Sequence, residues 1–133
     1  MKLKLAFAAF ATVITELLGG WDDLLYVYLV LMSLDYLTGL MKAAYIRQAS
    51  SYTGYRGIFK KVGFLCAIAV TALIDQHVLH TDPWAHTAVL YFFAGIEMLS
   101  IIENLEEIGV PIPPILKNML AQVSAKGAGA SGQ

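Results

Sequence analysis

Two carboxylates lie inside long apolar runs of this sequence, and they are the side chains best placed to do chemistry. Asp35 is near the middle of the run 24–46, and Glu97 is well inside the run 84–102. A charge at such a depth in hydrocarbon costs about 2.5–3.5 kcal/mol on insertion scales. We therefore expect each carboxylate to be protonated, or to face other helices or water.

Helical spacing extends each carboxylate into a polar stripe, because polar residues recur three or four positions apart on the same face. The stripes either join helices through hydrogen bonds worth about 0.6–2 kcal/mol each, or they are buried together in one assembly state and line water in another. The expected pore-lining or oligomer-interface residues are Asp35, Thr38, Lys42, Glu97, Ser100, Glu103 and Asn104.

The remaining polar residues form no pattern typical of an enzyme. The sequence has no nucleophile with a neighbouring base and no glycine loop for phosphate. His77, His80 and His86 fit no zinc spacing, and Cys66 lies in an apolar run where a small buried hydrophobe is expected. We therefore expect no enzyme activity, no metal site and no cofactor.

The composition indicates which medium surrounds the elements that hold these side chains. Of 133 residues, 58% are apolar and 14% are charged, and the mean hydropathy is +0.64. Soluble domains are about 45–50% apolar and 25% charged. A chain of this length cannot bury so much apolar surface inside itself, so the lipid bilayer is the expected partner.

The apolar runs predict an all-α integral membrane protein, a small multi-pass helical bundle. Four transmembrane helices are expected at about 3–20, 24–46, 58–79 and 84–105, forming a transmembrane domain over 1–108. The first run is short and contains Glu16 near its end. Three spans with an interfacial N-terminal helix are therefore the alternative.

The last part of the chain differs in composition from the apolar runs. Residues 109–123 begin with prolines that stop a helix and continue with apolar residues at helical spacing. They predict a proline hinge and a short amphipathic helix. Residues 124–133 are rich in Gly, Ala and Ser and are expected to form a flexible tail.

Basic residues indicate the orientation. Arg47, Arg56, Lys60 and Lys61 crowd the connection between the second and third runs, whereas the flanking connections are acidic. Short loops rich in Lys and Arg remain in the cytoplasm, so we expect a cytoplasmic basic loop and, with four spans, both termini in the cytoplasm. This bias accounts for the basic residues without nucleic-acid binding.

Small residues on the third run predict a helix-packing face. Gly63, Ala67 and Thr71 recur every four residues, a spacing that allows two membrane helices to approach closely. Gly39 on the second run is expected to have the same role.

Four short motifs, taken in order, resemble the toxin-secretion and phage-lysis holin family. They are Asp35-Tyr36-Leu37-Thr38-Gly39, Gly57-Ile58-Phe59-Lys60-Lys61, Glu97 to Asn104, and Gly109-Val110-Pro111-Ile112-Pro113. The similarity extends from about residue 24 to residue 120. One position departs from the family pattern, because Ile96 stands where an asparagine is usual.

The resemblance implies a protein that accumulates in the bacterial cytoplasmic membrane and forms homo-oligomers. At a set time these open non-specific pores that release an endolysin or a toxin, with an antiholin as a further partner. A small ion channel or proton-coupled transporter using Asp35 and Glu97 is the alternative, and a regulatory partner that delays a holin is another.

Overall fold

The computed structural model describes residues 1–47 and 51–131, and every regular element in those ranges is a helix. A π-helical segment, η1, directly continues the third α-helix. In chain order the elements are α1 (Lys2–Leu17), α2 (Asp23–Tyr45), α3 (Ser51–Leu73), η1 (Ile74–Leu79), α4 (Trp84–Glu107) and α5 (Pro114–Ser131). The all-α class expected from the sequence is confirmed.

Within the described residues, three helices are long and apolar enough to cross a membrane, namely Asp23–Tyr45, Gly54–Leu79 and Trp84–Glu107. The fourth span expected at 3–20 is not confirmed. Helix α1 has 16 residues and is about 24 Å long at 1.5 Å per residue, less than the ~30 Å hydrocarbon core. It ends before Gly19 and Gly20, whose φ angles of 99° and 86° are incompatible with a continuing helix.

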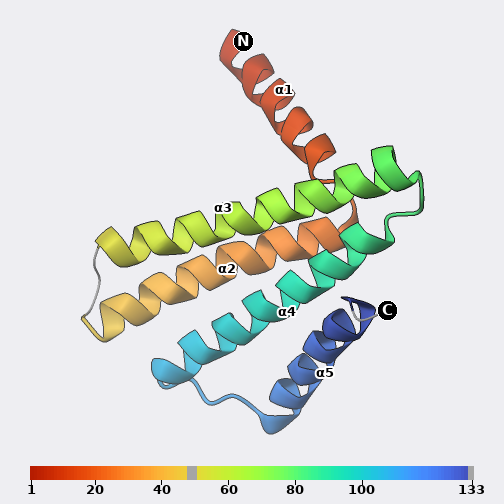
Figure 1. The fold of residues 1–133 in the computed structure, drawn as a ribbon. Coiled ribbons are helices and arrows are strands. Elements are labelled where there is room, and N and C mark those ends of the chain that lie inside the picture. The colour runs from red at the N-terminus through yellow and green to blue at the C-terminus, as the bar shows by residue number, and fades with distance from the viewer. Residues whose placement is uncertain (48–50, 132–133) are drawn as a thin grey trace.

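The three long helices form a bundle with two distinct ends (Figure 1). Helices α2 and α4 run in the same direction, and α3 runs in the opposite direction between them in the chain. We call the end where α2 and α4 finish and α3 begins the basic end, because Lys42, Arg47 and Arg56 lie there. Helix α1 leaves the other end and points away from the bundle, across the direction of the three helices (Figure 1).

Local sequence explains the helix boundaries. Asp22 caps α2, because its side-chain Oδ1 accepts a hydrogen bond from the Leu25 backbone N–H at 2.7 Å. After α4 the chain turns at Gly109, with a φ angle of 91°, and the prolines that follow prevent the helix from resuming until Pro114. Each long helix therefore ends where the polar residues or prolines begin.

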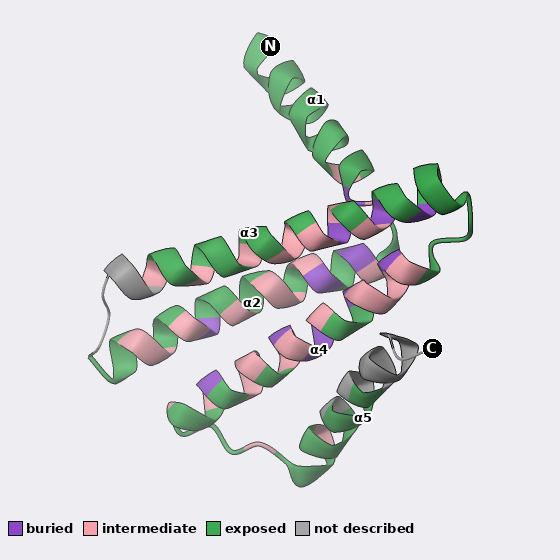
Figure 2. Cartoon of the chain, in the orientation of Figure 1, coloured by how far each residue is buried: buried purple, intermediate pink, exposed green. Residues whose placement is uncertain are grey.

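The core lies between α2, α3 and α4, towards the end from which α1 leaves. Its fully buried members include Leu25, Tyr28, Ile68 and Leu90. Phe64 on α3 stacks on Phe93 on α4 with ring centroids 4.3 Å apart. Buried positions lie on the facing sides of these helices, and their outward sides are largely exposed (Figure 2). An exposed apolar exterior of this kind suits a lipid environment.

Helix α5 packs along α4, and Lys117 near its start forms an ion pair with Glu106 at the end of α4. The helix continues to Ser131, through most of the segment 124–133 that was expected to be a flexible tail. The alanines of this segment favour helix and offset its glycines. Residues 132–133 lie outside the described residues.

Candidate functional site

One lysine joins the two intramembrane carboxylates. Lys61 Nζ on α3 donates hydrogen bonds to Asp35 Oδ2 on α2 at 2.7 Å and to Glu97 Oε2 on α4 at 2.8 Å. The side chains of Lys61, Asp35 and Glu97 are 15%, 15% and 2% exposed. We call these three residues the carboxylate–lysine cluster. It connects all three membrane-length helices.

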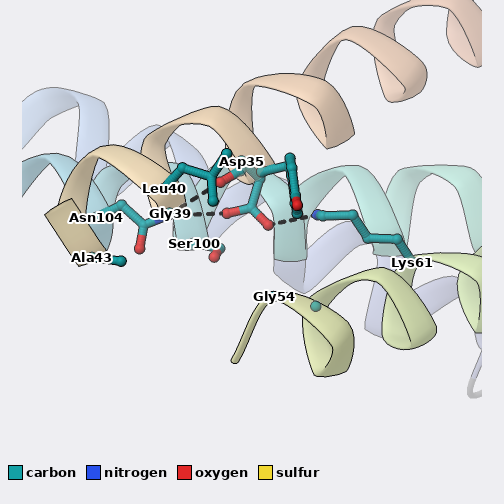
Figure 3. Close-up of a pocket in the computed structure, with 10 residues that line it drawn as sticks. Asp35, Gly39, Leu40, Ala43, Gly54, Lys61, Ser100 and Asn104 are labelled. Carbon is teal, nitrogen blue, oxygen red and sulfur yellow. Dashed lines mark hydrogen bonds and ion pairs between the residues drawn. The ribbon is translucent and has the colours of Figure 1, made fainter. Parts of the chain in front are cut away.

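Asn104 on α4 supports the cluster from the basic end. Its Nδ2 donates to Asp35 Oδ1 at 3.2 Å and to Thr38 Oγ1 at 3.1 Å, while Thr38 Oγ1 donates to the Asp35 carbonyl at 3.1 Å. Gly39 lies beside this amide, and a Cβ built there would be in ordinary van der Waals contact with Asn104 Nδ2, at 3.7 Å. Figure 3 shows Asn104 and Lys61 approaching Asp35 from two sides.

The cluster carries more negative than positive charge. Two carboxylates and one ammonium, all ionised, sum to one net negative charge in a region with little water. Buried charges are stable only when paired and hydrogen bonded, and Lys61 together with Asn104 satisfies most of this requirement. The remaining negative charge must be balanced by a proton or a cation, or be hydrated.

Two cavities beside the cluster provide space for hydration. One of about 230 Å³ lies between α2, α3 and α4, where small residues widen the gap between helices. A second of about 200 Å³ adjoins Lys61 and Glu97. Both volumes exceed the space that one water needs, and both offer several polar partners. The first cavity is lined by Asp35, Tyr36, Gly39, Leu40, Ala43, Gly54, Gly57, Lys61, Ser100 and Asn104.

The structure brings together Asp35, Thr38, Glu97 and Asn104 of the seven expected polar residues, and Ser100 lines both cavities. Lys42 instead pairs with Glu107 at 2.9 Å at the exposed basic end. Glu103 is exposed.

Lys61 differs most from its expected position. Its place beside Arg56 and Lys60 in the sequence predicted a cytoplasmic basic loop, yet it lies within α3 and points into the bundle. Spacing places it on the same face of α3 as Phe64 and Ile68 of the core, which follow it by three and seven residues, but spacing does not identify its partners. The acids were also expected to face one another or water, but here a cation of the same chain pairs with them.

The other expected basic residues lie nearer the basic end of the bundle. Arg47 follows the end of α2 with a φ angle of 56°, and Arg56 and Lys60 are exposed on α3. Lys60 Nζ lies 5.6 Å from the centre of the Phe64 ring.

The small-residue face of α3 contributes little packing inside the described chain. Gly63 is exposed, and a Cβ built there meets nothing within 4 Å. Ala67 and Thr71 are half-buried, and the Thr71 hydroxyl donates to carbonyls of its own helix.

A second buried polar site, which sequence reasoning missed, lies where α1 leaves the bundle. Asp75 in η1 accepts a hydrogen bond from the His86 backbone N–H at 2.8 Å, and His86 Nε2 lies 2.6 Å from the Leu18 carbonyl oxygen. Asp75 and His86 are almost completely buried. We call this arrangement the His86 lock. From the sequence, both residues were assigned to a solvated connection between two helices, and only tertiary contacts reveal their role.

The polar side chains of the described residues include no group of three or more His, Cys, Asp or Glu placed to hold a metal ion. Among the described residues, two buried side-chain atoms have no hydrogen-bond partner, namely Tyr28 Oη and Asp75 Oδ1. These atoms mark where the bundle interior is least well satisfied.

Comparison with known proteins gives consistent matches. The model of the bacteriophage holin family matches residues 12–125. An uncharacterized 14.9 kDa protein from the nagH 3′ region of Clostridium perfringens is 37% identical over 125 residues, covering 93% of this chain and 94% of the relative. An uncharacterized protein of Listeria innocua is 34% identical over 124 residues, covering 93% and 88%. A probable holin of Bacillus phage phi105 is 32% identical over 103 residues, covering 77% and 76%. No solved structure matches.

Proposed function

Since this chain belongs to the bacteriophage holin family, we propose that it acts as a holin. It accumulates in the cytoplasmic membrane of a bacterial host, assembles with copies of itself and opens non-specific lesions. An endolysin or a toxin then crosses the membrane. The relative named a probable holin and the three apolar helices of membrane length support this proposal.

The observation that carries the mechanism is the division of the carboxylate–lysine cluster between helices. Lys61, the one cation of the cluster, is on α3, whereas Asp35 and Glu97 are on α2 and α4, which run parallel to each other. In the closed form Lys61 pairs with both carboxylates inside one protomer and neutralises one of their two negative charges. A single protomer can then remain in lipid without exposing an unpaired carboxylate.

Opening, in this proposal, separates α3 from the α2/α4 pair. Helices α2 and α3 pack much less closely than α2 and α4, so this is the weaker boundary of the bundle. Separation removes the ammonium and leaves a polar face of Asp35, Thr38, Glu97 and Ser100. Such a face is stable only next to water, so lateral assembly around a water-filled lumen favours it.

The charges also couple the mechanism to the membrane potential. Moving one elementary charge through the full membrane field changes its energy by about 2.3 kcal/mol per 100 mV. Displacement of Lys61 relative to the carboxylates moves charge within that field. Loss of the potential should therefore change the probability of opening.

The orientation follows from the basic end. Lys42, Arg47, Arg56 and Lys60 cluster there, so the positive-inside bias favours a cytoplasmic position for this end. The end of α4 and helix α5 are then cytoplasmic as well. An antiholin that delays opening is a further expected partner, and it could act on the same helix boundary.

One experiment tests the proposal directly. The chain is induced alone in bacteria that contain a folded cytoplasmic reporter protein, and release of the reporter is measured beside leakage of potassium. A holin releases both, at a reproducible time after induction. Potassium leakage without reporter release would instead favour the ion channel or proton-coupled transporter, for which the charged cluster beside a cavity is the relevant feature.

A second arm separates the holin from a regulatory partner. The chain is co-expressed with an active holin, and the time of lysis is recorded. A regulatory partner delays lysis and releases nothing when expressed alone. Early or unchanged lysis, with release by the chain alone, supports the holin.

A further inference from the structure

The His86 lock fixes the corner between α1 and α2. The Leu18 carbonyl can only accept a hydrogen bond, so His86 Nε2, 2.6 Å away, carries the proton. Gly19 lies against the same imidazole, and a Cβ there would come within 2.7 Å of the His86 ring. The first turn of α4 thus holds the residues that follow α1. The direction of α1 is therefore set by the fold and not by a free hinge.

Helix α1 has two different faces. At 100° per residue five of its large apolar side chains form one continuous stripe, and the polar side chains lie opposite, together with Leu5. Thr12 and Thr15 donate to carbonyls of their own helix at 2.9 and 2.8 Å. The stripe consists of Leu3, Phe7, Phe10, Ile14 and Leu17, all exposed, and α1 buries none of its residues in the described chain.

The three long helices define the direction of the membrane normal, and α1 runs across that direction at the end opposite the basic end (Figure 1). Aromatic side chains occur at the same level. Trp21 and Tyr26 are exposed and meet edge to face with ring centroids 6.0 Å apart, and Trp84 at the start of α4 is exposed too. Exposed Trp and Tyr side chains are typical of the boundary between hydrocarbon and headgroups.

We propose that α1 is an interfacial helix whose apolar stripe lies in the lipid surface on the non-cytoplasmic side, held there by the His86 lock. The occupant of the stripe is the lipid surface, because an amphipathic helix lying in the membrane plane buries its apolar face in the headgroup boundary. The N-terminus is then outside the cytoplasm. This inference rests on the three spans and their orientation, and it does not depend on pore formation.

Cysteine labelling tests the side of the membrane. Cys66 is replaced by serine, single cysteines are introduced at exposed positions, and intact cells are treated with a membrane-impermeant maleimide. Thr12→Cys, on the polar face of α1, should react to the same extent as His77→Cys, near the end of the second span, Gly54–Leu79. Asn118→Cys on α5 should react only after the membrane is permeabilised. If Thr12→Cys, like Asn118→Cys, reacts only after the membrane is permeabilised, the proposal is overturned, because α1 would then start in the cytoplasm.

Fluorescence quenching tests the depth. Trp21 and Trp84 are replaced by phenylalanine, and Phe10→Trp places one tryptophan in the centre of the stripe. The protein is reconstituted in phosphatidylcholine vesicles with bromine at different depths of the acyl chain. Quenching should be strongest with the shallowest bromine, and Thr12→Trp on the opposite face should be quenched less.

Two other quenching results would overturn the proposal. Strongest quenching by bromine near the acyl-chain ends would mean that α1 crosses the bilayer. Quenching that disappears as the protein-to-lipid ratio rises would mean that the stripe packs against a second copy of the chain. Every substitution in the quenching variants is at an exposed position, so the fold of the bundle is preserved in each variant.

Discussion

Replacing Lys61 by methionine removes the ammonium of the carboxylate–lysine cluster while keeping a long side chain of similar volume. The net charge of the cluster changes from one negative charge to two. Asp35 and Glu97 then remain in the same small volume with no cation between them. The closed form of the protomer should be strongly destabilised, because like charges repel and neither carboxylate is fully hydrated.

The size of this effect follows from burial and from the cavities. Breaking a buried ion pair by removing one partner costs about 3–5 kcal/mol. The Glu97 side chain is buried, at 2% exposed, and the Asp35 side chain is half-buried, at 15% exposed, but cavities of about 230 and 200 Å³ allow water to reach both. The lower limit, about 3 kcal/mol, is the appropriate value. It corresponds to roughly two powers of ten in the ratio of closed to open protomers.

Lysis timing is the assay, and the neighbouring lysine provides a matched control. Lys60→Met removes the same group one residue earlier, where the side chain is exposed and contacts the Phe64 ring, an interaction worth about 0.5–1 kcal/mol. At equal amounts of membrane protein, Lys61→Met should lyse cells early and Lys60→Met close to the normal time. Identical timing of the two variants would refute the role of the cluster.

A rescue variant distinguishes loss of the closed form from failure to insert. Combining Lys61→Met with Asp35→Asn and Glu97→Gln removes all three charges and leaves polar groups that can hydrogen bond to one another. Membrane levels and normal timing should both recover in this triple variant. If membrane levels recover but lysis remains early, charge compensation is not what holds the closed form.

The remaining predictions concern single positions. Asp35→Asn leaves a neutral Lys61–Glu97 pair, so the closed form should be favoured and lysis delayed; early lysis would contradict the sign of the charge argument. Gly19→Ala should lower the thermal stability of the purified protein more than Gly20→Ala, because both have positive φ angles but only Gly19 abuts His86; equal losses would show that backbone strain alone matters. Gly63→Leu should leave the thermal unfolding of the protomer unchanged, since nothing lies within 4 Å of its Cβ, yet reduce cross-linked oligomers if this face of α3 forms the assembly contact.

The long helices were the most predictable part of the fold. Runs expected at 24–46 and 84–105 correspond closely to α2 (Asp23–Tyr45) and α4 (Trp84–Glu107), because apolar length and polar ends define such helices directly. The third run was expected to begin at residue 58, but α3 begins at Ser51. Hydropathy detects the part of a helix that suits lipid and does not detect a polar extension of the same helix.

The candidate site was predictable in its acids and not in its cation. Asp35 and Glu97 stood out because a charge in an apolar run requires an explanation. Lys61 did not, since the positive-inside bias explains a lysine near a membrane boundary equally well. Its hydrogen bonds join residues 26 and 36 positions apart in the chain. Pairing over such separations depends on how α3 packs against α2 and α4, and local spacing contains no information about that packing.

For the proposed holin, acids that are paired within one chain change what must happen before a lesion opens. If the acids could be paired only by neighbouring copies, each single protomer would be unstable in lipid by about 2.5–3.5 kcal/mol per charge. Assembly would then begin as soon as two copies met. With Lys61 bound to Asp35 and Glu97, the single protomer tolerates the bilayer and can accumulate. In the proposed mechanism, assembly must first separate α3 from the acids, so its rate depends on protein density and on the stability of the cluster together. This dependence gives a physical basis for a delay between synthesis and opening.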